Sequence, residues 1–198
     1  MSLERYEKIV IVTGLPRSGT SMMMKMLEAG GVTPLCDGLR SADSDNPNGY
    51  YEFEPVKQTR SDASWLDEAP GKAVKMVYSL LYDLPVDRQY EVIFMRRELN
   101  EILASQSQML QNMNIVSGVD DCRMAKLFER EILRFQQWLS TASHINSVEV
   151  RYNDVASGSE HPINSINEHL GGTLNVAAML SVVDSSLYRN RSAASTAA

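Results

Sequence analysis

Residues 9–21 read Ile9-Val10-Ile11-Val12-Thr13-Gly14-Leu15-Pro16-Arg17-Ser18-Gly19-Thr20-Ser21, and this stretch decides the fold. An apolar run rich in β-branched residues, typical of a buried strand, leads into a loop bounded by Gly14 and Gly19 and then into a helical pattern. Glycine lets the backbone curl so that successive N–H groups point at one anion. The N-terminus of the following helix adds a partial positive charge. The stretch therefore predicts a P-loop-like phosphate-binding loop in an α/β fold.

The loop departs from the nucleotide P-loop in one respect. The pattern G-x-x-x-x-G-K-[ST] requires a lysine after the second glycine, whereas Thr20 and Ser21 follow Gly19 here. The basic residue lies inside the loop instead, at Arg17. This departure makes an enzyme that uses Mg-ATP less expected. A protein that binds another activated, phosphate-like group remains a candidate.

Composition indicates a protein of ordinary globular type. The chain has 198 residues, of which 43% are hydrophobic and 22% charged, so it is long enough for one α/β domain. No run approaches the roughly 18 apolar residues of a membrane span. The first eight residues are polar and lack the apolar core of a secretory signal, so we expect a cytoplasmic protein.

Two further features of the composition limit the chemistry. Cys36 and Cys122 are the only cysteines, and neither lies in a metal-ligand pattern, so we expect unpaired thiols and no metal site. The formal net charge is −6 and the pI about 5.1, which argues against a nucleic-acid partner. A small anionic ligand needs only a local basic pocket.

Hydrophobic periodicity alternates between strands and helices along the chain. We expect strands at 8–13, 73–78, 91–95 and 148–151, and helices at 20–29, 98–113, 123–142 and 162–170. This alternation predicts a single-domain, three-layer α/β/α fold with a central parallel sheet. Residues 37–71 break the pattern and predict an irregular insertion that acts as a lid over the pocket. Residues 192–198 are expected to form a disordered tail.

A second anion site is predicted where the strand at 91–95 ends. Arg96 and Arg97 follow this strand, so they lie at the carboxyl edge of the sheet, where open α/β folds bind ligands. Ser105 lies eight residues after Arg97 on the polar side of the next helix, so a guanidinium and a hydroxyl converge on one phosphate. The alternative is a surface arginine paired with Glu101.

These two segments resemble the sulfotransferase family. The segment Pro16-Arg17-Ser18-Gly19-Thr20-Ser21 is similar to the family's P-[KR]-S-G-T-[TS] loop, and Arg97 with Ser105 matches its R-x-x-x-x-x-x-x-S motif. The family usually has a proline just after that arginine, where this chain has Glu98 and Leu99. This departure leaves open whether Arg96 or Arg97 is the ligand.

Weaker likenesses extend the resemblance over roughly residues 8–191, which we treat as one domain from residue 1 to 191. Val150-Arg151-Tyr152-Asn153-Asp154-Val155 is similar to the family's Y-[EN]-D-L segment. Ser186-Leu187-Tyr188-Arg189-Asn190-Arg191 resembles the basic close of bacterial members, which makes Arg189 a further candidate for cofactor binding.

The resemblance implies the cofactor 3′-phosphoadenosine-5′-phosphosulfate (PAPS) and transfer of its sulfuryl group to a hydroxyl or amine of a small acceptor. Residues 16–21 would hold the 5′-phosphosulfate, with Arg17 neutralising charge on the bridging oxygen. Arg97 and Ser105 would select the 3′-phosphate.

A hydroxyl acceptor also needs a base, for which Glu52 and Glu54 are the candidates. The alternative is that these two carboxylates only form surface ion pairs with Lys57 or Arg60. Two other functions stay open: a small-metabolite kinase that uses Mg-ATP, and a non-catalytic nucleotide-binding module. The expected partner is a small molecule rather than nucleic acid or membrane, and a homodimer is left open.

Overall fold

The computed structural model describes residues 8–40, 43, 46, 49–112, 114–115 and 120–184. The expected tail at 192–198 and the candidate Arg189 lie outside the described residues.

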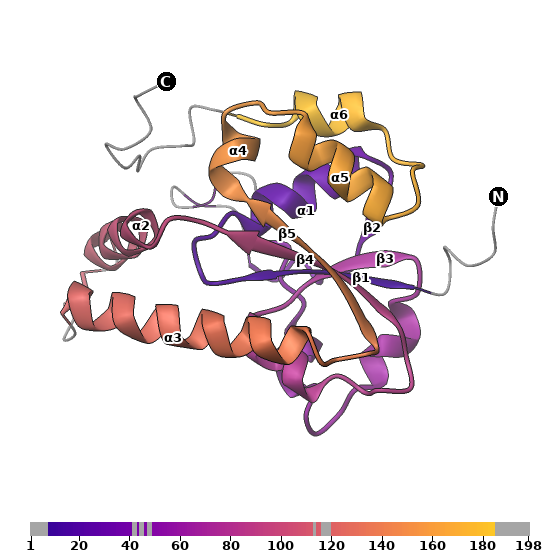
Figure 1. The fold of residues 1–198 in the computed structure, drawn as a ribbon, viewed down its shortest axis with the longest axis horizontal. Coiled ribbons are helices and arrows are strands. Elements are labelled where there is room, and N and C mark those ends of the chain that lie inside the picture. The colour runs from indigo at the N-terminus through magenta and orange to yellow at the C-terminus, as the bar shows by residue number, and fades with distance from the viewer. Residues whose placement is uncertain are drawn as a thin grey trace.

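A parallel sheet forms the centre of the molecule (Figure 1). In the described part of the chain it has five strands in the order β2-β3-β1-β4-β5. Each pair of neighbouring strands is parallel, as the sequence predicted. The strands are β1 (Ile9–Gly14), β2 (Thr33–Pro34), β3 (Lys72–Lys75), β4 (Tyr90–Arg96) and β5 (Ile145–Arg151).

Helices cover both faces of the sheet, because β1 sends alternate apolar side chains to opposite sides. Val10 and Val12 pack in a cluster with the helices shown at the top of Figure 1, and Ile9 and Ile11 pack in a second cluster with the helices on the other face. The first group is α1 (Thr20–Ala29), α4 (Tyr152–Ala156), α5 (His161–His169) and α6 (Val176–Ser181). The second includes α2 (Leu99–Asn112), α3 (Asp121–Leu139) and the 3₁₀ helix η4 (Tyr78–Asp83).

Most predicted elements form within a few residues of their expected ends. The strand expected at 73–78 is shorter, because β3 ends at Lys75 and the chain turns into η4. β2, α4 and α6 were missed, since they are too short to show a hydrophobic period.

The described residues of the segment 37–71 form neither an α-helix nor a strand, as expected for an irregular insertion, yet the segment is not without structure. It holds two 3₁₀ helices, η2 (Glu54–Gln58) and η3 (Ser64–Glu68). Trp65 and Leu66 of η3 are buried in the second core cluster. Two hydrogen bonds tie the start of the segment to its middle. The Asp37 N–H donates to the Glu52 carbonyl, and the Glu54 N–H donates to the Asp37 carboxylate. The insertion is therefore anchored to the sheet.

The strand register places the ends of the strands at one edge of the sheet. Gly14 of β1 is level with Met95 of β4, and Arg96 is level with Arg151 of β5. The predicted phosphate-binding loop at residues 14–19, Lys75 and the arginine pair at 96–97 therefore leave the sheet on the same side. No helix in the described residues is long and apolar enough to cross a membrane.

Candidate functional site

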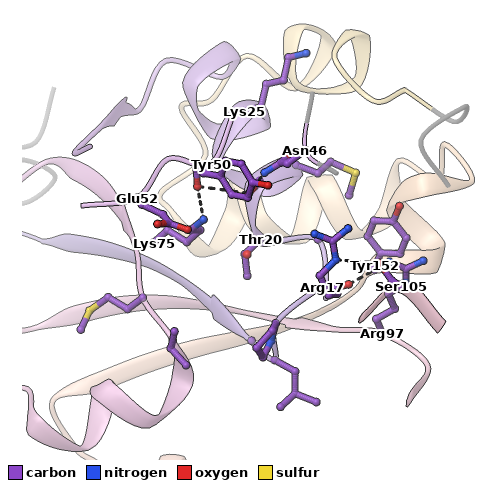
Figure 2. Close-up of a pocket in the computed structure, with 18 of the residues that line it drawn as sticks. Arg17, Thr20, Lys25, Asn46, Tyr50, Glu52, Lys75, Arg97, Ser105 and Tyr152 are labelled. Atoms are coloured by element: carbon purple, nitrogen blue, oxygen red, sulfur yellow. Dashed lines mark hydrogen bonds between the residues drawn. The ribbon is translucent and has the colours of Figure 1, made fainter. Parts of the chain in front are cut away.

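A cavity of about 560 Å³ opens at this edge of the sheet, within the size range of small-molecule sites. Its wall comes from the phosphate-binding loop, α1, the insertion, the end of β3, α2 and Tyr152. Figure 2 shows two groups of polar side chains on either side of Thr20: Tyr50, Glu52 and Lys75 form one, and Arg17, Arg97, Ser105 and Tyr152 form the other.

The phosphate-binding loop has an unusual backbone. Arg17 has a φ of 69° and Gly19 a φ of 93°, both in the left-handed region that side chains disfavour. Gly19 also lies against Tyr152, because a Cβ at this position would be 2.3 Å from the Tyr152 Cδ2 atom. Glycine is therefore required at 19 for both its φ and its contact.

The helix that follows the loop presents to the cavity an N-terminus of the kind that suits an anion. The N-cap residue of α1 is Gly19, which has no side chain to accept a hydrogen bond from the first turn, and this turn contains no acidic residue. The N–H groups of a first helical turn have no carbonyl partner within the helix. Thr20, Ser21 and Met22 of this turn line the cavity, so the positive end of α1 faces it.

The two predicted anion motifs touch one another. Arg17 Nε donates to Ser105 Oγ at 2.9 Å (Figure 2), and Arg97 Nη1 donates to the Arg17 carbonyl at 3.1 Å. All three residues line the cavity. Residues 88 apart in sequence thus form one polar wall.

Arg96 lies elsewhere. Its guanidinium forms an ion pair with Glu149 at 3.3 Å and lines a second groove along the ends of β4 and β5, away from the phosphate-binding loop. Of the two arginines that the sequence left open, Arg97 lines the main cavity. Its guanidinium is also paired with Glu101, in a buried contact rather than the exposed one considered above.

The opposite wall holds a lysine that sequence reasoning missed. Lys75, the last residue of β3, donates from Nζ to the Tyr50 carbonyl. Burial lowers the pKa of Lys75 from 10.5 to about 8. The sequence could have indicated Lys75, because it ends a short strand just as Arg96 and Arg97 follow the strand at 91–95. That end marks the ligand-binding edge of the sheet.

The two candidate bases occupy different places. Glu52 lines the cavity, and its Oε1 accepts a hydrogen bond from Arg40 at 2.9 Å. Glu54 is not among the lining residues; it is exposed and pairs with Lys57 at 2.5 Å. The structure therefore brings one of the two carboxylates to the site.

The cavity is rich in positive charge although the chain is acidic. Among the described residues, six cationic side chains line it and two carboxylates do so: Arg17, Lys25, Arg40, Lys57, Lys75 and Arg97 against Glu52 and Asp184. None of the three histidines lines it. No group of three or more His, Cys, Asp or Glu side chains suited to a metal ion occurs in the described ranges.

Comparisons with known proteins identify the fold. No family model matches the sequence, and no curated protein matches it. The sulfotransferase domain of the olefin synthase of Synechococcus PCC 7002 matches with a TM-score of 0.57 at 14% identity, over 89% of this chain and 77% of that one. Mouse sulfotransferase SULT7A1, solved in complex with PAP, matches with a TM-score of 0.56 at 16% identity, over 94% and 67%. The chain has the sulfotransferase fold.

The resemblance read from the sequence is thereby confirmed at the level of the fold. Within the sulfotransferase fold, the cavity gathers most of the predicted site residues: Pro16, Arg17, Gly19, Thr20, Ser21, Glu52, Arg97 and Ser105. Ser18 is fully buried behind the loop, where its N–H donates to the Leu15 carbonyl. Ser18, Glu54 and Arg96 are therefore the described candidates that lie outside the cavity wall.

Proposed function

We propose that this protein is a PAPS-dependent sulfotransferase that moves a sulfuryl group to a hydroxyl or amine of a small acceptor. One observation carries the proposal: the loop motif and the R-x-x-x-x-x-x-x-S motif meet in one cavity, through the 2.9 Å hydrogen bond between Arg17 and Ser105. A donor that carries an anionic group at each end of a nucleotide needs two such sites close together.

The residues present fit this donor. Bound PAPS would supply the activated sulfuryl group. The N–H groups of Thr20 and Ser21, together with Arg17, would hold the 5′-phosphosulfate end, and Ser105 with Arg97 would hold the 3′-phosphate. Lys75 adds a half-buried positive charge on the opposite wall, suited to stabilising charge on the transferred group.

Glu52 is the proposed proton acceptor. Its carboxylate faces the cavity beside Lys75, and the cavity has an apolar wall formed by Phe53, Val56, Met76, Val77 and Leu80. An acceptor molecule bound against these side chains would place its hydroxyl between Glu52 and the phosphate-binding loop. Glu54 is less suited to this role, because its carboxylate is exposed to solvent and pairs with Lys57.

The kinase alternative lacks its magnesium ligand at the sheet edge. P-loop kinases hold Mg²⁺ with an Asp that follows an apolar strand. β3 and β4, which flank β1, end here in Lys75 and Arg96. β5, the other neighbour of β4, ends in Arg151. Each of these ends carries a positive side chain instead of a carboxylate.

The test measures 3′-phosphoadenosine 5′-phosphate (PAP) formed from PAPS, with benzyl alcohol as a hydroxyl probe that needs a base and benzylamine as an amine probe. We expect Glu52→Gln to lower turnover about 10²–10⁴-fold while PAP affinity is retained, because the amide keeps the shape and loses the basicity. Glu54→Gln is the matched control and should stay active. Equal activity of both variants would remove Glu52 as the base. Failure of the wild-type protein to bind PAP would overturn the sulfotransferase proposal itself.

A further inference from the structure

Glu101 is a buried carboxylate to which the proposed reaction gives no role. It lies on α2, one turn before Ser105, and is 2% exposed. Its Oε2 accepts a hydrogen bond from Arg97 Nε at 3.0 Å, and its Oε1 accepts one from Asn153 Nδ2 at 3.1 Å. One carboxylate therefore joins α2 to the end of β4 and to α4.

The groups around Glu101 continue to the phosphate-binding loop. Arg97 lies with its guanidinium carbon 4.3 Å from the centre of the Tyr152 ring, and its Nη1 donates to the Arg17 carbonyl. The same Tyr152 ring lies against Gly19. Arg97 and Tyr152 thus contact Arg17 and Gly19, whose φ values of 69° and 93° are both left-handed.

This arrangement explains how the loop keeps a costly conformation. A non-glycine residue at a φ of 69° persists only where its surroundings hold it. The side chains of Arg97 and Glu101 are 7% and 1% exposed, and charges so deeply buried are costly unless they are paired in good geometry. A buried ion pair of this kind is by itself weak evidence for stability.

We propose that Glu101 is a positioning residue: it fixes Arg97, with Asn153 and Tyr152 beside it, so that the loop at 15–19 keeps the backbone that binds the 5′ anion. The inference rests on the proposed function only in naming that anion. It assigns Arg97 a second task besides the 3′-phosphate, and it couples the two halves of the donor site.

The first test needs no nucleotide. Amide hydrogen exchange is measured by mass spectrometry on the ligand-free wild type, Glu101→Gln and Arg97→Lys, with Arg96→Lys as the matched control. We expect faster exchange in peptides that cover residues 15–22 in the first two variants, unchanged exchange in the control, and unchanged exchange in α5 throughout. Unchanged exchange of the loop in Glu101→Gln and Arg97→Lys would overturn the proposal. If Glu101→Gln does not fold, Arg97→Lys decides, because its single ammonium cannot reach both Glu101 and the Arg17 carbonyl.

The second test uses calorimetry with two probes, AMP and PAP. In Glu101→Gln, loss of the loop conformation should weaken AMP binding roughly tenfold to a hundredfold, and PAP binding by at least the same factor, because Arg97 also holds the 3′-phosphate in the proposed function. Ser105→Ala should weaken PAP and leave AMP unchanged. Tighter PAP binding in Glu101→Gln would show that Glu101 acts only as a nearby negative charge, which overturns the positioning role. If the wild type binds neither nucleotide, the proposed function fails, whereas hydrogen exchange still decides the role of Glu101.

Discussion

Arg17 combines a proposed chemical role with a backbone that side chains disfavour. Its φ of 69° means that substitution changes two things at once, the guanidinium and the strain. Alanine removes the guanidinium and keeps a Cβ in the left-handed region, whereas glycine removes both. The pair of variants therefore separates the role of the side chain from that of the backbone.

We expect Arg17→Gly and Arg17→Ala to lose turnover equally, roughly 10²–10³-fold, because each lacks the donor aimed at the leaving oxygen. Arg17→Gly should be the more stable by about 0.5 kcal/mol or more, since alanine at a positive φ is strained. PAP formation from PAPS and urea unfolding provide the two measurements. An active Arg17→Gly variant would remove the guanidinium from the mechanism.

Lys75 makes stability depend on pH. Its pKa falls from 10.5 in the unfolded chain to about 8 in the folded protein, because of burial. Between these two values the unfolded chain binds more protons than the folded protein, so stability rises with pH across this window. Below pH 8 the amine is charged in both states, and the folded protein bears the full cost of burying it.

Lys75→Met should therefore raise stability at pH 7 and flatten the rise between about pH 8 and 10.5. Urea unfolding at four pH values across this range is the measurement. Lys72→Met, which removes a lysine of the same strand outside the cavity, is the control. If both variants keep the rise with pH, Lys75 is not its source.

At the scale of elements, the contact between the loop and α4 depends on Gly19. Gly31, just after α1, is the matched control: its φ is 97°, close to the 93° of Gly19, but an added Cβ would meet nothing within 4 Å. Alanine at 31 should cost about 1–2 kcal/mol through backbone strain alone. Alanine at 19 meets Tyr152 as well and should cost a further 1–3 kcal/mol.

Urea unfolding of the two variants measures this difference, and Tyr152→Ala tests its source. In the Tyr152→Ala background, the excess cost of alanine at 19 should vanish, because the atoms that it meets are gone. Equal costs at 19 and 31 in the wild-type background would show that the ring moves aside freely.

The elements that the sequence predicted are those with a long period or a distinctive turn. β1, α1 and β4 follow from apolar runs and the two glycines, and the all-parallel sheet follows from their alternation with helices. The spacing of Arg97 and Ser105 placed both on one wall, because strand ends and the next helix have a fixed geometry. These features are local in sequence.

The site residues that were not predicted depend on contacts between distant segments. Lys75 gains its place through the Tyr50 carbonyl, and Glu101 through Asn153, 52 residues away. The difference between Glu52 and Glu54 likewise depends on Arg40 and on the anchoring of the insertion at Asp37. The hydrophobic periodicity of the sequence does not reveal such partners, because they come together only once the sheet has assembled.

At the scale of the whole molecule, charge is strongly separated. The chain has a formal net charge of −6, yet six cationic side chains among the described residues line one cavity. A field of this shape concentrates small anions in the cavity while the remaining surface repels large ones.

This separation leads to a test that distinguishes the two enzyme classes without a known acceptor. A ligand that binds only the folded state stabilises it by about 2.7 kcal/mol at a hundredfold excess over Kd, and each kcal/mol moves the melting temperature of a chain of this size by roughly 2–4 °C. We expect PAP without magnesium to raise the melting temperature by about 5–10 °C, and Mg-ATP at the same concentration to do little. Ser105 and Arg97 offer a site for a 3′-phosphate, which ATP lacks, and β3, β4 and β5 end in Lys75, Arg96 and Arg151 where a kinase needs an acidic magnesium ligand. A larger shift with Mg-ATP than with PAP would favour the kinase over the sulfotransferase.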